Sequence, residues 1–164
     1  MYKKILVPLD GSEQAECVLT HVKNIAADCP IESVIFLQVV KPTSFLSIAS
    51  RIDPDVEPKD YQRMSDKIED IEKQRIIHAR KYLSDVINRL DLGNIACKLE
   101  VVVGKVARTI VQYSEDNGIH MIMLAAHGQS GIHRWSIGSI ADKVMRISSA
   151  PVLLIRHSRE KSIS

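Results

Sequence analysis

Aromatic residues are scarce in this chain of 164 residues, of which they make up 4%, with a single tryptophan. Proteins that bind single-stranded nucleic acids stack the bases on aromatic side chains, so this scarcity argues against such a surface. The chain also lacks an excess of charge of one sign, because its formal net charge at pH 7 is only +2. General nucleic-acid binders carry a strong basic excess, and we therefore expect no nucleic-acid partner.

Cysteine is sparse as well, since Cys17, Cys29 and Cys97 are far apart and no CxxC pair is present. This spacing suits neither a zinc site nor a redox motif, and it predicts reduced, partly buried thiols in a cytoplasmic protein. The amino-terminal apolar run from Ile5 to Val7 is too short for a signal peptide. No apolar run has the length of a membrane span, so we expect none.

Two common phosphate-binding motifs are missing, because the chain contains neither GxxxxGK[ST] nor GxGxxG. Their absence argues against a P-loop kinase and against a dinucleotide-dependent oxidoreductase. No motif lysine is available to neutralise a transferred phosphoryl group. We therefore assign no catalytic residue and no direct metal ligand, and expect at most slow ATP hydrolysis.

What the chain does have is short aliphatic runs that alternate with amphipathic segments. Wholly apolar runs are typical of a parallel sheet covered by helices on both faces. A helix over residues 60–90 would be roughly 45 Å long, and its N-terminal half would either overhang such a sheet or fray. The expected strands are residues 2–7, 34–40, 96–103, 121–126 and 152–155, and the expected helices are residues 13–27, 60–90, 105–117 and 138–148.

The segments between these elements complete the expected organisation. Three prolines predict a loop over residues 41–59, long enough to act as a lid. In the last helix we expect Ile140, Val144 and Ile147 to face the core. No internal repeat or domain boundary is visible, so we expect one domain over residues 1–157 and a C-terminal tail over residues 158–164.

Two loops follow expected strands at the same edge of the sheet, where ligands bind if the strand order reverses between them. One is the Pro8–Ser12 stretch, and the other runs from Gly128 to Gly138. At the second loop's end a helix begins, and its first backbone N–H groups, near Ser139, have no intrahelical partner and favour an anion such as phosphate. The spacing alone is equally compatible with ordinary turn chemistry, in which Asp10 is a turn residue.

Three stretches resemble the universal stress protein family in order and spacing: MYKKILVPLDGSEQAECVLTHV, EVVVGKVARTIVQYSEDNGIHMIMLAAHG and AAHGQSGIHRWSIGSIADKVMRISSAPVLLIR. The resemblance implies an α/β fold, an open five-stranded parallel sheet of order 3-2-1-4-5 with helices on both faces. This fold is Rossmann-like and similar to that of the adenine nucleotide alpha hydrolases. One branch of the family binds ATP through G-x2-G-x9-G-[ST]. Here those positions hold Ala125, Gly128, Gly138 and Ser139, so alanine replaces the first glycine.

By the same resemblance, the ligand is ATP or AMP, with Mg²⁺ held through the phosphates. Asp10 would meet the ribose or metal edge, Val39 would meet adenine through its backbone, and Leu124 would pack against the base or ribose. The phosphates would be held by the backbone N–H groups of Gly128, Gly138, Ser139 and Ile140. The complete set of implied nucleotide-binding residues is Pro8, Leu9, Asp10, Val39, Leu124, Ala125, His127, Gly128, Gly138, Ser139 and Ile140.

Three functions remain open at this point: a nucleotide-binding regulatory protein of the stress response, a weak ATP hydrolase, and a dimeric interaction module without nucleotide. Ala125, together with Gln129 where many members carry arginine or lysine, favours the last, whereas Gly128, Gly138 and Ser139 oppose it. The final strand is expected to be an apolar sheet edge, which invites pairing with another chain. The resemblance implies a homodimer through that strand, with Val152, Leu153 and Leu154 near the two-fold axis.

Overall fold

The computed structural model describes residues 2–43, 58–126 and 137–156 of the chain. Within the helix that begins at Pro58, it describes the side chains of Arg63 and of residues 65–90. Most of the expected 41–59 loop and the expected C-terminal tail lie outside the described residues. The possibility that the loop acts as a lid therefore stays a prediction.

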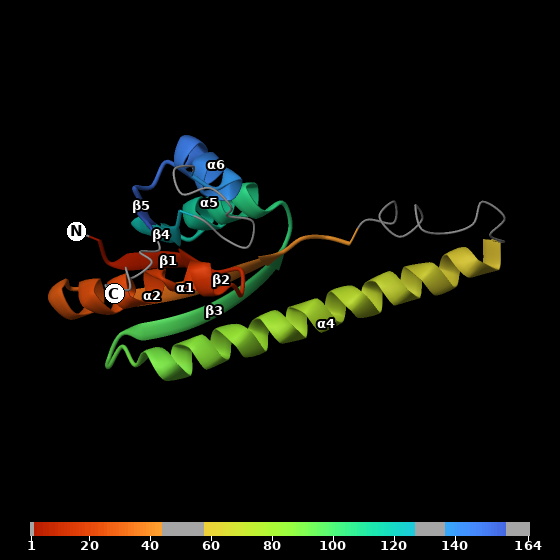
Figure 1. Cartoon of the computed structure of the whole chain (residues 1–164), viewed down its shortest axis with the longest axis horizontal. Helices are drawn as coiled ribbons and strands as arrows, with labels where there is room; N and C mark the ends of the chain where they lie inside the picture. The colour runs from red at the N-terminus through yellow and green to blue at the C-terminus, as the bar shows by residue number, and fades with distance from the viewer. Residues whose placement is uncertain (1, 44–57, 127–136, 157–164) are drawn as a thin grey trace, which may run out of the picture.

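The described residues form one five-stranded sheet in which every pairing is parallel and the strand order is β3-β2-β1-β4-β5 (Figure 1). This arrangement confirms the predicted fold class and strand order. The predicted strand boundaries differ from the observed ones by at most two residues at any end. The strands are β1 (Lys4–Pro8), β2 (Ser33–Val40), β3 (Ala96–Val103), β4 (Met121–Ala125) and β5 (Val152–Ile155).

Helices cover both faces of the sheet, as the apolar strands require. On one face lie α1 (Glu13–Glu16), α2 (Val18–Asp28) and α4 (Pro58–Leu90), and on the other lie α5 (Val106–Asp116) and α6 (Ser139–Ile147) (Figure 1). The single helix predicted over residues 13–27 is divided at Cys17 into α1 and α2. No glycine or proline marks this break in the sequence, so the pattern gave no sign of it.

Side chains of β1 alternate between two hydrophobic cores, because neighbouring residues of a strand point to opposite faces. Ile5 and Val7 pack with α2 and α4 on one face, whereas Leu6 packs with α5 and α6 on the other. All three side chains are fully buried. Burial on both faces places the central strand between the two cores.

Helix α4 has 33 residues, which corresponds to a length of about 50 Å. Its C-terminal part packs on the sheet through the buried residues Leu83, Val86 and Leu90. Its N-terminal part extends past the sheet, as the predicted length required (Figure 1). Ile77, on the side of the helix away from the core, is 55% exposed.

Two predictions about burial were wrong. Ile147 was expected to face the core, yet it is 53% exposed, because the buried stripe of α6 is centred on Ala141 and Val144 and leaves Ile147 to one side. Cys29 was expected to be partly buried but is exposed at the end of α2, where the chain leaves the core. Cys17 and Cys97 are half-buried free thiols, as predicted.

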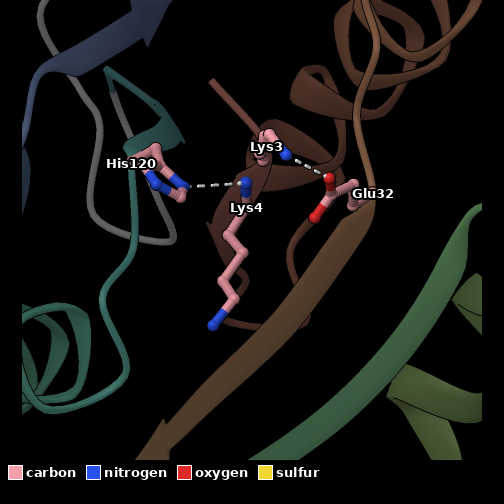
Figure 2. Close-up of polar contacts among 4 residues, drawn as sticks. All are labelled: Lys3, Lys4, Glu32 and His120. Atoms are coloured by element: carbon pink, nitrogen blue, oxygen red, sulfur yellow. Dashed lines mark hydrogen bonds and ion pairs between the residues drawn. The ribbon is translucent and has the colours of Figure 1, made fainter. Parts of the chain in front are cut away.

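Polar contacts join the amino ends of the central strands (Figure 2). The Lys4 backbone N–H donates to His120 Nδ1 at 3.1 Å, and Lys3 Nζ lies 2.6 Å from Glu32 Oε1. The hydrogen bond from Lys3 lowers the pKa of the Glu32 carboxyl. These contacts pair polar groups at the amino ends of the central strands.

Among the described residues, no helix combines the length and hydrophobicity that crossing a membrane requires.

The packing of α4 predicts a large difference between two truncations on the same helix. Leu83→Ala should lower the free energy of unfolding by about 2–5 kcal/mol, because Leu83 is fully buried between α4 and the sheet. Ile77→Ala, on the exposed side, should change it by less than about 0.5 kcal/mol. Urea denaturation followed by circular dichroism measures both values. Equal losses in the two variants would contradict this placement of α4.

Candidate functional site

The sheet opens where β1 and β4 separate. These strands pair only at Ile5 with Met121 and at Leu6 with Ile122, whereas β1 continues to Pro8 and β4 to Ala125. This is also where the strand order reverses, since β2 and β3 lie on one side of β1 and β4 and β5 lie on the other. A reversal of this kind leaves a crevice beyond the carboxyl ends of the strands, which is where ligands bind in open α/β sheets.

The backbone of Val39 faces this crevice. The last ladder contact between β1 and β2 is the hydrogen bond from Leu9 N to Leu37 O, at 2.9 Å. Strand residues two apart present their N–H and C=O to the same side, so Val39 directs both groups toward the space beyond β1. No described strand lies beside Val39 there, because β1 ends at Pro8, opposite Leu37. The Val39 N–H donor and C=O acceptor therefore lie side by side at the mouth of the crevice.

The turn from β1 into α1 forms the crevice wall next to Val39. Asp10 Oδ1 accepts hydrogen bonds from the Ser12 backbone N–H at 3.0 Å and from Ser12 Oγ at 2.5 Å. Ser12 Oγ in turn accepts from the Ala15 N–H at 3.1 Å and caps α1. Gly11 lies between them with φ +83°, a left-handed conformation that glycine adopts without steric cost. One carboxylate oxygen of Asp10 thus stabilises the turn, as expected for an ordinary turn residue.

The opposite wall is the N-terminus of α6. Gly138 N donates to Ala126 O at 2.7 Å, which joins the start of the helix to the end of β4. The first intrahelical bond runs from Asp142 N to Gly138 O at 2.9 Å. The amides of Ser139, Ile140 and the following alanine therefore lack an intrahelical acceptor, and no described side chain caps them. The Gly138 amide, which the resemblance assigns to the phosphates, is already engaged.

Between these walls lies a cavity of about 750 Å³, within the roughly 300–1,000 Å³ usual for small-molecule sites. Every predicted site residue that the structure describes lines it. His127 and Gly128 lie outside the described residues, as does Gln129. The predicted residues that the structure brings together are Pro8, Leu9, Asp10, Val39, Leu124, Ala125, Gly138, Ser139 and Ile140.

Ala125 occupies the position where the resembling motif has its first glycine. It is the last residue of β4, paired with Ile155 of β5, and it has no positive φ. Alanine therefore fits the backbone here without strain. Its methyl group takes up space in the cavity but does not disturb the strand.

Side chains of β2, α4 and the loop after β2 also line the cavity, and sequence reasoning missed them. Lys41 follows β2 directly, so its place at the carboxyl edge was a usable signal. The α4 residues gave none, because which turn of a long helix meets the sheet edge depends on how the helix crosses the sheet. The missed residues with polar side chains are Gln38, Lys41, Arg75, His78 and Tyr82.

The cationic side chains in the described lining outnumber the anionic ones. Lys41 and Arg75 border the cavity, and Arg75 Nη1 donates to Thr43 Oγ1 at 3.2 Å. Among the described lining residues, Asp10 is the only carboxylate. The described part of the chain contains no cluster of three or more side chains suited to hold a metal ion. The cavity is therefore suited to an anionic ligand more than to a bare cation.

Tyr82 lies on the α4 side of the cavity with its hydroxyl buried. Burial first, and then a hydrogen bond to the Glu16 carboxylate, raise the pKa of Tyr82 above its ordinary value. Glu16 itself is bound by Arg89, whose Nη2 lies 2.7 Å from Glu16 Oε2. The Tyr82 hydroxyl is thus protonated throughout the physiological pH range.

Comparison with known proteins gives matches over nearly the whole chain. The family described as "Universal stress protein family" matches residues 1–156. Universal stress protein MJ0577 of Methanocaldococcus jannaschii is 30% identical over 164 residues, covering 95% of this chain and 96% of that protein. The solved structure of MJ0577 superimposes with a TM-score of 0.75 at 27% identity, over 97% of this chain and 99% of that chain.

Two more distant solved structures share the fold. The universal stress protein from Archaeoglobus fulgidus in complex with dAMP has a TM-score of 0.59 at 20% identity, covering 94% of this chain and 98% of that chain. An Arabidopsis thaliana family member with AMP bound has a TM-score of 0.60 at 13% identity, covering 99% and 97%. The match to the family over residues 1–156 and the 30% identity to a curated relative show that this chain belongs to the universal stress protein family.

Proposed function

We propose that this protein is a regulatory stress-response protein that binds an adenine nucleotide, ATP or AMP, in the cavity at the carboxyl edge of the sheet. It does so in the cytoplasm, as a single domain over residues 1–157. The observation that supports the proposal is that two sets of unpaired backbone groups line opposite walls of one cavity. The Val39 N–H and C=O face it from one wall, and the first amides of α6 face it from the other.

The α6 end of the cavity is suited to the phosphates. The amides of Ser139, Ile140 and Ala141 have no intrahelical acceptor, and the helix dipole adds a partial positive charge at this end. The cationic side chains Lys41 and Arg75 border the same cavity. Together they favour a ligand with a negatively charged group, and a nucleoside phosphate carries one.

The β2 end of the cavity is suited to the adenosine part. Adenine presents a hydrogen-bond donor beside an acceptor, and the backbone of Val39 offers the complementary pair. Leu124 and Ala125 supply apolar surface at the end of β4. The binding of dAMP and of AMP by relatives with the same fold supports this assignment.

A divalent ion would be held mainly by the phosphates. The described residues provide no cluster of carboxylate, imidazole or thiolate ligands, so the chain alone does not form an ion cage. Mg²⁺ commonly binds through one or two carboxylates and substrate phosphates, and it keeps several waters. We therefore propose that Mg²⁺ enters with ATP and not before it.

Binding, and not dedicated hydrolysis, fits the described lining. A hydrolase positions a water with a general base or a polar side chain and stabilises the phosphoryl group with a lysine or arginine. Asp10 is the only carboxylate in the described lining, and one of its oxygens is engaged by Ser12. Nucleotide occupancy would then act by stabilising one state of the protein, with at most slow hydrolysis.

Thermal unfolding with ligand tests the proposal directly. At a concentration about one hundred times its dissociation constant, a nucleotide that binds only the folded state adds roughly 2.7 kcal/mol to the free energy of unfolding. AMP, or ATP with Mg²⁺, should therefore raise the melting temperature, whereas ribose 5-phosphate should raise it much less. An unchanged melting temperature at millimolar AMP would favour an interaction module without nucleotide.

Gly138→Val should abolish nucleotide binding while the fold remains intact. Gly138 has φ −60° and ψ 147°, which valine tolerates, so the backbone is not strained. Gly138 lines the cavity, next to the amides proposed to hold the phosphates, so we expect the added side chain to take up space needed by the ligand. Isothermal titration should show no saturable binding of AMP.

A suitable control for that variant is Lys143→Val, which adds the same side chain at an exposed position of the same helix, outside the cavity. Its affinity for AMP should equal that of the unmodified protein. If Gly138→Val binds AMP as tightly as this control, the phosphates do not lie at the start of α6.

We further propose a homodimer through β5. This strand ends the sheet, and an exposed apolar edge favours pairing with a second chain. Leu153 is 38% exposed on β5, and Met145 and Ile147 are exposed at the neighbouring end of α6. In this dimer Val152 and Leu154 flank Leu153 near the two-fold axis.

Leu153→Glu should convert the dimer to a monomer, because it places a charge at an apolar edge where the two copies would meet. Sedimentation velocity at micromolar concentration should give a dimer for the unmodified chain and a monomer for the variant. Thr109→Glu, on α5 away from β5, is the control and should stay dimeric. A monomeric unmodified chain would contradict the proposed interface.

A further inference from the structure

Two cationic side chains border the cavity at the end away from α6. Lys41 follows the last residue of β2, and Arg75 reaches this end from α4, where its Nη1 donates to Thr43 Oγ1 at 3.2 Å. Helix α6 instead begins beside the end of β4, where Gly138 N donates to Ala126 O. Because β1 lies between β2 and β4, the two ends are separated by two strand spacings, about 10 Å. A phosphate held by the α6 amides therefore lies away from Lys41 and Arg75.

The charged groups of Lys41 and Arg75 are open to a ligand, because both residues are exposed and line the cavity. Among the residues that the structure describes, no carboxylate forms an ion pair with either of them. Asp10 is the only carboxylate in the described lining, and its Oδ1 is engaged by Ser12. Positive charge is therefore in excess at this end of the cavity, which favours a second anionic group there.

One face of α4 connects this cationic pair to the turn after β1. Arg75, His78 and Tyr82 follow one another at intervals of three and four residues, so they share a face of the helix, and all three line the cavity. Helix α1, which follows the Asp10 turn, packs into the same hydrophobic core as α4. Arg75 lies about 10 Å further along α4 than Tyr82. A group that leaves the Asp10 turn on this face of the sheet therefore meets the α4 wall and, further along it, Arg75.

The proposed placement of an adenine nucleotide leaves this direction for the second anion. In that placement the base faces Val39, the 5′ phosphate faces the start of α6, and the ribose hydroxyls face Asp10. When one ribose hydroxyl donates a hydrogen bond to Asp10, the other is left to carry a substituent. Because Asp10 lies on the α1 and α4 side of the cavity, that substituent projects toward the α4 wall.

We propose that the cavity takes an adenine nucleotide with a second phosphate on the ribose 2′ or 3′ oxygen, and that Lys41 and Arg75 bind this phosphate. The Arg75 guanidinium and the Lys41 ammonium group both form charge-assisted hydrogen bonds with phosphate oxygens. This inference rests on the proposed adenine-nucleotide site and goes beyond ATP and AMP by naming a class of ligand that carries phosphate at both ends of the cavity.

Titration with AMP, ADP, adenosine 2′,5′-bisphosphate and adenosine 3′,5′-bisphosphate tests the inference. ADP is the matched ligand, because it has as many phosphates as the bisphosphates but carries both at the 5′ end. One of the bisphosphates should bind about tenfold more tightly than ADP, the scale of one charge-assisted hydrogen bond. If neither bisphosphate binds more tightly than ADP, the inference is overturned.

Arg75→Gln and Lys41→Gln should each remove most of the advantage of the bisphosphate over ADP. Each substitution deletes one positive charge from the pair and keeps a polar side chain. Arg80→Gln and Lys81→Gln are the controls, at exposed positions of α4 outside the cavity, and should keep the full advantage. Rising salt should also reduce the advantage, because exposed charges are screened. Melting temperatures without nucleotide check that each variant is folded.

The outcomes separate this inference from the proposed function. If Arg75→Gln and Lys41→Gln weaken ADP and the bisphosphate by the same factor, the two cations act on the 5′ phosphates and the inference is wrong. If AMP binds and Gly138→Val abolishes its binding, but neither bisphosphate exceeds ADP, the nucleotide site stands and only this inference fails. If the unmodified protein binds none of the four nucleotides, the proposed function fails and this inference fails with it.

Discussion

A parallel strand that extends past its neighbour has backbone N–H and C=O groups that no strand can pair. In this protein the constraint applies at the point where β1 and β4 separate, because the order of the strands reverses there. Val39 on β2 and the start of α6 are both left with unpaired groups by that separation. Unpaired backbone groups require a partner, and in a cavity of this size the partner is water or a ligand. A bound adenine nucleotide, as proposed, would supply that partner.

The two hydrophobic cores make this edge possible. Ile5, Leu6 and Val7 are buried on alternate faces of β1, so the central strand is held from both sides and its end is fixed in space. At the amino edge of the sheet, Lys4 and His120 pair polar groups. Among the described residues, the unpaired backbone groups of Val39 and of the start of α6 lie around the cavity at the carboxyl edge.

Much of the fold was predictable, because short apolar runs such as Val152–Ile155 have few alternatives to a buried parallel strand. The two loops that meet at the cavity were predictable for the same reason, since both follow strands at one edge. The division of the first helix at Cys17 was not, because no helix-breaking residue marks it. The outward position of Ile147 was missed because the nine residues of α6 are too few to define where the buried stripe is centred. The contribution of Tyr82 depends on how α4 crosses the sheet, which no local pattern in the sequence encodes.

The central claim is that a nucleotide bridges the unpaired backbone of β2 and the start of α6. The most direct test is a titration of ¹⁵N-labelled protein with AMP, monitored amide by amide in ¹H–¹⁵N correlation spectra. The account predicts saturable shifts that are largest at Val39, Ser139 and Ile140, and no shifts at Lys4 and His120 on the opposite edge. Spectra unchanged at Val39 and at the start of α6, with AMP at millimolar concentration, would contradict it.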